Sequence, residues 1–230
     1  YGDWSIYSGQ KNFTPDKIDG SLITHLNFAF MDADENGDLI TTDTWADYEN
    51  PNVGYSVGTD NKYAGVLGGM LLLRQKYPNM KIGISVGGWT RSGDFPKLAA
   101  SEKTRKNFAN NVAKFVQFYG YDFVDIDWEY PTASSANQFT SFMRYLREGL
   151  TQRGLTLSSA VAATSGTYQT DEVLYMVDWI NVMAYDGDGG AGHSPYSLLT
   201  NSFNYWNSTR KVDASKIVLG VPFYERPNWA

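Results

Sequence analysis

The chain contains no cysteine and only two histidines among its 230 residues. The absence of cysteine excludes a disulfide framework, a thiolate metal site and a cysteine nucleophile. Two histidines far apart in the sequence leave little basis for a zinc site or a histidine-based triad. Acidic side chains outnumber basic ones by 25 to 19, the opposite of the balance typical of nucleic-acid-binding proteins. No apolar run approaches the roughly 18 residues that predict a membrane-spanning helix.

Aromatic residues are abundant instead, with 7 tryptophans, 16 tyrosines and 12 phenylalanines. Rings with apolar faces and polar edges suit sugars, because a pyranose presents C–H bonds on its face. The same residues also fill protein cores and stabilise them by burial. Composition alone favours the core role, so a sugar-binding site needs support from motifs.

Short apolar runs alternate with helical patterns along the chain. Strands are predicted at 4–7, 23–30, 81–86, 123–130, 156–162, 179–184 and 217–221. Helices are predicted at 63–77, 137–152, 170–177 and 198–206, and another begins at Ser101 and ends before Gly120. Strands joined through helices predict a parallel sheet. Because no G-x-G-x-x-G motif follows the first strand, we predict an α/β fold of the (β/α)8 TIM-barrel type rather than a doubly wound sheet.

Residues 1–230 are predicted to form a single catalytic domain. A closed barrel of this type needs eight strands, whereas about seven are found and the last ends at Val221. The domain is therefore expected to be truncated before the eighth strand, with a gap between its first and seventh strands. Such a piece is expected to be poorly stable and nearly inactive by itself. The irregular stretch from Met31 to Asn61 is predicted to be a loop at the carboxyl ends of the strands.

The strongest functional signal is the run DFVDIDWEY, from Asp122 to Tyr130. Side chains alternate along a strand, so Asp125, Asp127 and Glu129 are predicted to share one face. Three neighbouring carboxyl groups cannot all ionise freely, which leaves one to hold a proton near neutrality, as a general acid requires. Two alternatives stay open here, namely a solvated acidic face on an antiparallel strand and a divalent-cation site.

Two further motifs follow predicted strands. In the run SVGGW, paired glycines would allow a ligand or a neighbouring strand to approach the backbone closely, with Trp89 at the mouth of the barrel. The run MAYD places the hydroxyl of Tyr185 and the carboxylate of Asp186 beside the acidic strand. The stretch from Asp186 to His193 lacks the spaced ligands of a calcium loop, so we predict a mobile active-site loop in which His193 is not a ligand.

Taken in order, these motifs resemble those of glycoside hydrolase family eighteen, the chitinase family, over essentially the whole chain. The family motif D-x-x-D-x-D-x-E is matched by Asp122, Asp125, Asp127 and Glu129, S-x-G-G by Ser85, Gly87 and Gly88, and M-x-Y-D by Met183, Tyr185 and Asp186. Two features depart from the family pattern. Glu225 stands where glycine is usual, and no segment resembles the family's eighth strand with its tryptophan.

The resemblance implies a chitinase that hydrolyses β-1,4-linked N-acetylglucosamine polymers with retention by substrate-assisted catalysis, without a metal or other cofactor. Glu129 would act as acid and base and Asp127 would stabilise the oxazolinium ion, while Asp125 and Tyr185 would complete the catalytic set. The implied substrate-binding residues are Tyr1, Trp4, Phe30, Gly88, Trp89, Met183, Asp186 and Arg226. The resemblance also implies cis peptide bonds at Ala29–Phe30 and Glu129–Tyr130.

The expected partners are chitin or N-acetylglucosamine oligosaccharides, with no nucleic acid and no membrane. We expect the protein to be secreted and to act as a monomer. One alternative is an endo-β-N-acetylglucosaminidase acting on glycoproteins, because such enzymes use the same motif. An inactive chitin-binding lectin is less well supported, because such relatives typically lose the acid that Glu129 would supply.

Overall fold

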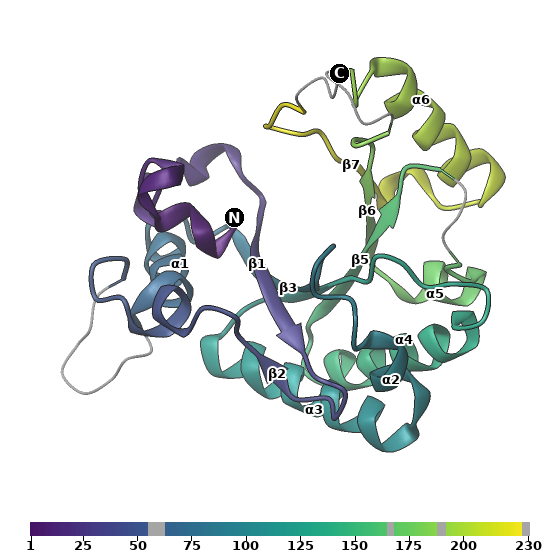
Figure 1. Cartoon of the computed structure of the whole chain (residues 1–230), viewed down its shortest axis with the longest axis horizontal. Helices are drawn as coiled ribbons and strands as arrows, with labels where there is room; N and C mark the ends of the chain where they lie inside the picture. The colour runs from purple at the N-terminus through teal and green to yellow at the C-terminus, as the bar shows by residue number, and fades with distance from the viewer. Residues whose placement is uncertain (55–62, 165–167, 188–191, 227–230) are drawn as a thin grey trace.

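The computed structural model describes residues 1–54, 63–164, 168–187 and 192–226. Its centre is one sheet of seven strands in the order β2-β1-β3-β4-β5-β6-β7 (Figure 1). The strands are β1 (His25–Ala33), β2 (Leu39–Ile40), β3 (Lys81–Gly87), β4 (Phe123–Asp127), β5 (Thr156–Ala162), β6 (Trp179–Met183) and β7 (Ile217–Leu219). Strand β2 pairs antiparallel with β1, and every other neighbouring pair is parallel.

Helices join the parallel strands and lie along the outer side of the curved sheet (Figure 1). The α-helices are α1 (Gly65–Lys76), α2 (Phe95–Ala100), α3 (Glu102–Tyr119), α4 (Ala136–Thr151), α5 (Asp171–Met176) and α6 (Tyr196–Asn204). Short 3-10 helices are η1 (Asp3–Ile6), η2 (Ser8–Gln10), η3 (Pro15–Lys17), η4 (Gly20–Leu22) and η8 (Ala214–Lys216), and η5 (Trp45–Glu49) and η7 (Tyr205–Thr209) are π-helices. No helix in the described ranges is both long and apolar enough to cross a membrane.

The ends of α3 show how local sequence sets an element. Its N-cap is Ser101, as predicted, and the Ser101 Oγ accepts the backbone N–H of Thr104 at 3.1 Å. Its C-cap is Gly120 with a left-handed φ of 66°, a conformation that glycine adopts without steric cost. The helix thereby satisfies backbone groups at both ends and turns directly into β4.

The outer face of β4 packs under the helices and the inner face carries the acids. Val124 and Ile126 are fully buried. Just beyond the strand, Trp128 stacks on Phe95 of α2 with ring centroids 5.2 Å apart and meets Phe139 of α4 edge-on at 5.3 Å. Because this apolar set occupies the outer face, the alternation of side chains turns the aspartates of β4 inward. A solvated acidic face on an antiparallel strand is therefore wrong, since β4 is buried and parallel to both neighbours.

The predicted α/β class and barrel type are confirmed by the parallel strand order and the outer layer of helices. Strand β7 pairs with β6, and no pairing among the described residues joins β7 to β1, so the predicted gap in the sheet is present. The predicted helices at 63–77 and 170–177 correspond to the slightly shorter α1 and α5, and the predicted helix at 137–152 corresponds to α4, shifted by one residue. Helix α2 was not predicted.

The predicted first strand at 4–7 is wrong, because this segment forms η1. The carboxylate of Asp3 accepts the backbone N–H of Trp4 at 2.7 Å, and the N–H of Ser5 donates to the carbonyl of Gly2 at 3.0 Å, which closes a turn. The N-terminal segment meets the sheet at an isolated parallel bridge between Gly2 and Ala29, and the amino group of Tyr1 donates to the carbonyl of Asn27 at 2.7 Å.

The predicted loop from Met31 to Asn61 is only partly a loop. It contains the end of β1, the antiparallel strand β2 and the π-helix η5. Asp34 holds the connection between β1 and β2, because its carboxylate accepts the backbone N–H groups of Asn36 at 2.9 Å and Asp38 at 2.8 Å. Residues 55–61 lie outside the described residues.

Candidate active site

The inner-face acids of β4 occupy two depths of one site. Asp125 and Asp127 line a cavity of about 230 Å³ inside the sheet. Asp127 and Glu129 line a wider cavity of about 710 Å³. Phe30, Asp127, Met183 and Tyr185 line both cavities, so the two spaces meet at these side chains. The predicted grouping of the three acids is therefore present, with Asp127 in the middle.

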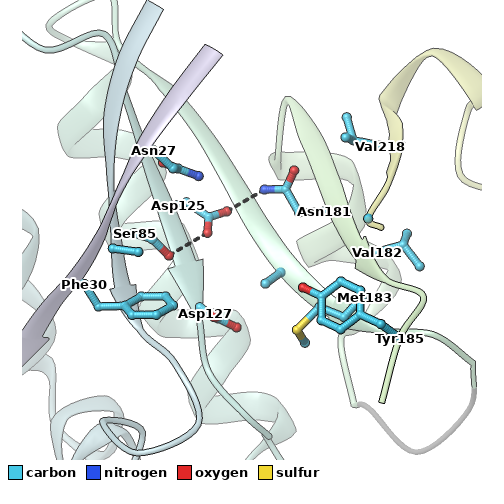
Figure 2. Close-up of a pocket in the computed structure, with 13 residues that line it drawn as sticks. Asn27, Phe30, Ser85, Asp125, Asp127, Asn181, Val182, Met183, Tyr185 and Val218 are labelled. Atoms are coloured by element: carbon cyan, nitrogen blue, oxygen red, sulfur yellow. Dashed lines mark hydrogen bonds between the residues drawn. The ribbon is translucent and has the colours of Figure 1, made fainter. Parts of the chain in front are cut away.

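Asp125 is buried among hydrogen-bond donors from three other strands, and Figure 2 shows the bonds with two of them, Ser85 and Asn181. The hydroxyl of Ser85 on β3 donates to Asp125 Oδ2 at 2.8 Å, and the hydroxyl of Ser158 on β5 donates to Oδ1 at 2.6 Å. The amide of Asn181 on β6 donates to the same Oδ1 at 2.9 Å. Burial raises the pKa of Asp125, and these three hydrogen bonds oppose the rise.

Asp127 has the opposite surroundings. Its Oδ1 is buried and has no hydrogen-bond partner among the described residues. Burial raises the pKa of Asp127 well above its usual range, and the neighbouring charges of Asp125 and Glu129 raise it further. Of the two aspartates, Asp127 is therefore the one whose surroundings favour the protonated form more strongly.

Glu129 follows β4 and is held by its backbone. Its N–H donates to Ser92 Oγ at 2.9 Å, two residues after β4 ends at Asp127. Burial raises the pKa of Glu129, a hydrogen bond with Tyr130 opposes the rise, and the charge of Asp186 adds to it. A half-buried carboxyl group with a raised pKa is suited to donate a proton near neutrality.

The acid at the start of the motif serves the fold. The carboxylate of Asp122 accepts the backbone N–H of Ile82 at 2.9 Å and forms ion pairs with Arg74 at 3.1 Å and Lys81 at 3.3 Å. These contacts tie β4 to α1 and β3 at the amino ends of the strands. Asp122 lines neither cavity, so its place in the motif is structural.

Asp186 lies at the rim of the wider cavity in a network of its own. Arg226 donates to both of its carboxylate oxygens at 2.7 Å, and the hydroxyl of Tyr224 donates to Oδ2 at 2.8 Å. The hydrogen bond from Arg226 lowers the pKa of Asp186. Asp186 and Arg226, which the sequence placed in the substrate site, therefore meet as a bidentate ion pair on the wall of the wider cavity.

His193 lies in the loop after β6, as predicted, yet it is buried and supports Asp186. The backbone N–H of Asp186 donates to Nδ1 of His193 at 3.0 Å. The imidazole also stacks on the ring of Tyr224 with centroids 5.3 Å apart. The middle of the predicted mobile loop, residues 188–191, lies outside the described residues.

The aromatic candidates are divided between the cavity wall and its surroundings. Trp89 lines the wider cavity with 75% of its surface exposed, as expected of a ring available for stacking. Trp4 and Tyr1 line neither cavity. Trp4 stacks on Phe30 with centroids 6.2 Å apart, and the Tyr1 hydroxyl donates to the carbonyl of Phe13. Sequence reasoning placed these two rings in the substrate site, and the structure places them beside it.

Gly88, predicted to bind substrate, lines neither cavity and lies against Phe30, which lines both. Its φ is +93°, and a Cβ added there would lie 3.2 Å from the ring of Phe30. The peptide bonds Ala29–Phe30 and Glu129–Tyr130 are both cis, as predicted. Within the described part of the chain, no group of three His, Cys, Asp or Glu side chains is arranged to hold a metal ion.

Sequence reasoning missed Ser158, Asn181 and Trp179, which surround Asp125 or its partners. A signal for two of them was present, because Trp179 and Asn181 alternate with apolar residues and precede Met183 by four and two positions. Trp179, Asn181 and Met183 share one face of β6, which is the face turned toward the site. Ser158 could have been found only from the register that sets it opposite Asp125.

The chain, with its buried carboxyl groups on a parallel sheet, is similar to glycoside hydrolases. Residues 1–229 match the family described as glycosyl hydrolases family 18. The chain therefore belongs to glycosyl hydrolases family 18. It spans 60% or less of the length of several chitinases that it resembles.

The relatives are chitinases from several kinds of organism. Chitinase 1 of Aphanocladium album is 34% identical, over 98% of this chain and 60% of that protein. The structure of chitinase ChiA74 from Bacillus thuringiensis superposes with a TM-score of 0.85 at 29% identity, covering 97% of this chain and 47% of that one. The group IV chitinase of Ostrinia furnacalis, solved in complex with allosamidin, gives a TM-score of 0.80 at 28% identity, covering 99% and 68%.

Proposed function

We propose that this protein is a chitinase that hydrolyses β-1,4-linked N-acetylglucosamine polymers with retention of configuration. The observation that carries the proposal is the graded set of Asp125, Asp127 and Glu129, which runs from the buried cavity to the wider one. The names of the relatives support chitin as the substrate class. Because a solid polymer is degraded outside the cell, we also propose that the protein is secreted.

The proposed mechanism uses the substrate as its own nucleophile. Glu129 donates its proton to the glycosidic oxygen as the bond from that oxygen to the anomeric carbon breaks. The carbonyl oxygen of the 2-acetamido group attacks the anomeric carbon and forms an oxazolinium ion. Water then attacks the same carbon, the bond from that carbon to the acetamido oxygen breaks, and Glu129 accepts the proton of the water as a general base, which restores the acetamido group and the protonated acid.

The residues around Glu129 would stabilise this intermediate. Asp127, where both cavities meet, would accept the acetamido N–H and stabilise the positive charge on the ring. Tyr185 lines the same junction, and burial raises the pKa of its phenol, which keeps the hydroxyl as a donor to the acetamido oxygen. Asp125 would keep a compensating negative charge one layer deeper.

The wall of the wider cavity would bind the neighbouring sugars. Trp89 offers an exposed ring for stacking against a pyranose face. From their ion-paired position, Asp186 would accept hydrogen bonds from sugar hydroxyls and Arg226 would donate hydrogen bonds to them. No acid other than those on or beside β4 is required by this scheme.

The test is a comparison of substrates with the full-length protein. Chitin oligomers are expected to be cleaved, whereas cellulose oligomers are not, because they carry a hydroxyl where the acetamido nucleophile would be. Comparable rates on the two polymers would contradict substrate-assisted catalysis. Preferential cleavage of a high-mannose glycoprotein would favour the endo-β-N-acetylglucosaminidase alternative, and oligosaccharide binding without any cleavage would favour the lectin.

A further inference from the structure

A chain of hydrogen bonds reaches Asp125 through two residues that the proposed mechanism does not use. The indole Nε1 of Trp179 donates to Oδ1 of Asn181 at 3.2 Å, and Nδ2 of Asn181 donates to Oδ1 of Asp125 at 2.9 Å (Figure 2 shows the second bond). Trp179 and Asn181 stand two positions apart on β6 and so share its inner face. Neither residue lines the wider cavity, where sugars are proposed to bind.

We propose that Trp179 and Asn181 are positioning residues that keep Asp125 ionised, so that the single proton of the Asp125–Asp127 pair rests on Asp127. The proposal rests on the function proposed above, because an oxazolinium cation at Asp127 needs a pair that carries a negative charge. A second proton would neutralise the Asp125–Asp127 pair and remove the stabilisation of the cation. The two residues of β6 would thus set the lowest pH at which the site works.

The orientation of the Asn181 amide is the first step of the argument. An asparagine presents an acceptor and a donor of nearly the same shape, so its orientation follows from its partners. The indole N–H of Trp179 can only donate, which turns Asn181 Oδ1 toward the indole and the NH2 group toward Asp125. The amide then cannot accept a hydrogen bond from a protonated Asp125, whereas a reversed amide could. An amide held as a donor therefore supports the ionised form of Asp125 alone.

The surroundings of the pair are the second step. Ser85 and Ser158 also donate to Asp125, so both of its oxygens are occupied as acceptors. Oδ1 of Asp127 has no donor among the described residues, and burial, together with the charges of Asp125 and Glu129, raises the pKa of Asp127. A proton entering the pair therefore goes to Asp127, and Asn181 contributes one of the hydrogen bonds that create the difference.

Few other groups near the pair can titrate. Glu129 lies beyond Asp127, and the Tyr185 phenol lines the same cavity from the end of β6. The residues that face the pair from the other strands carry no charge, and they are Asn27, Ala29, Ser85, Ser158, Ala160, Val218 and Gly220. His25 meets the ring of Trp179 edge-on at 5.2 Å and is the titratable group packed against that end of the chain of hydrogen bonds.

The experiment is the pH dependence of kcat/KM on N-acetylglucosamine oligomers, measured with the full-length protein. Asn181→Leu removes the donor and keeps the volume, so the acid limb is expected to move up by about one pH unit, the equivalent of one charge-assisted hydrogen bond. KM is expected to stay within about twofold while kcat falls. Trp179→Phe frees the Asn181 amide to reverse. It is expected to move the acid limb in the same direction but by less than Asn181→Leu does. Because Trp179 acts through Asn181, the double variant is expected to shift no further than Asn181→Leu.

The matched control lies between the two residues on the same strand. Ile180 is fully buried on the outer face of β6, so Ile180→Val is expected to lower Tm and leave the acid limb in place. Acid limbs that stay unchanged in Asn181→Leu and Trp179→Phe would overturn the proposal, as would an equal shift in Ile180→Val. If Asn181→Leu fails to fold, Trp179→Phe decides alone.

A second measurement separates this proposal from the proposed function. Infrared difference spectra follow the carbonyl band of a protonated carboxyl group and need no turnover. The band of protonated Asp125 is assigned with Asp125→Asn. If this band forms at higher pH in Asn181→Leu than in the parent, the result would support the role of Asn181 even if the parent cleaved no chitin oligomer. An unshifted band would overturn it even if the parent proved to be an efficient chitinase.

Discussion

Replacing Glu129 with glutamine removes the only proton donor that the proposed first step requires. Glutamine keeps the size and hydrogen-bonding capacity of the side chain but cannot transfer a proton. Burial and the charge of Asp186 raise the pKa of Glu129, so the parent carries the needed proton toward neutral pH. General acid catalysis contributes typically about 10²–10⁴-fold, which corresponds to roughly 3–5 kcal/mol of activation free energy. We expect Glu129→Gln to lower turnover of chitin oligomers by at least the smaller of these factors.

The structure also predicts that the fold and sugar binding survive this substitution. Glu129 is anchored through its backbone N–H, which donates to Ser92 Oγ at 2.9 Å and is unaffected by the change. The exposed Trp89 and the ion pair of Asp186 on the wall of the wider cavity also remain. Calorimetric titration with a chitin oligomer is therefore expected to give a Kd near that of the parent, at an unchanged Tm.

The assay compares two leaving groups. A sugar leaves only when its oxygen is protonated, whereas an aryl glycoside releases a phenolate that departs without help. Glu129→Gln is expected to lose far more activity on oligomers than on aryl N-acetylglucosaminides. Turnover of oligomers within tenfold of the parent would remove Glu129 from the acid role, and so would equal losses on the two substrates.

Asp127→Asn is expected to lower kcat by orders of magnitude and Asp125→Asn by less, because Asp125 lies one layer further from the sugar; the reverse ranking would exchange their roles. Asp186→Asn removes a negative charge that raises the pKa of Glu129, so the alkaline limb of the pH–rate profile is expected to move to lower pH, and a move to higher pH would contradict this cause. Burial raises the pKa of Asp47 from 3.8 to about 7, so the free energy of unfolding falls as pH rises from the lower value to the higher one and stays lowered above it. Asp47→Asn is therefore expected to raise Tm by a few degrees at about pH 8, since 1 kcal/mol corresponds to about 2–4 °C in a chain of this size. At about pH 4 the substitution is expected to change Tm little. Equal changes in Tm at the two pH values would refute the reasoning.

The places where sequence reasoning failed share a physical cause. Residues 4–7 carry apolar and aromatic side chains that favour a strand, yet the carboxylate of Asp3 accepts the N–H of Trp4 and the segment coils into η1. Helix α2 is only six residues long, too short for a periodic pattern to stand out. Both segments are short, so local hydrogen bonds and packing determine their structure and the sequence pattern predicts it poorly.

Much of the site follows from local rules that hold in any fold. A strand alternates its side chains, so Asp125, Asp127 and Glu129 had to face one way once β4 was recognised. Glycine at position 88 and the apolar residues between the acids were likewise visible along the chain. Motif order then led to the family that the comparison confirms.

Only the tertiary structure decided how each acid differs from its neighbours. The partners of Asp125 come from 40, 33 and 56 positions away, at Ser85, Ser158 and Asn181. Their meeting depends on the register of four parallel strands, which no single segment encodes. Sequence periodicity placed three carboxyl groups on one face, but burial and long-range hydrogen bonds determine which of them holds a proton, because a pKa responds to every group that folding brings nearby.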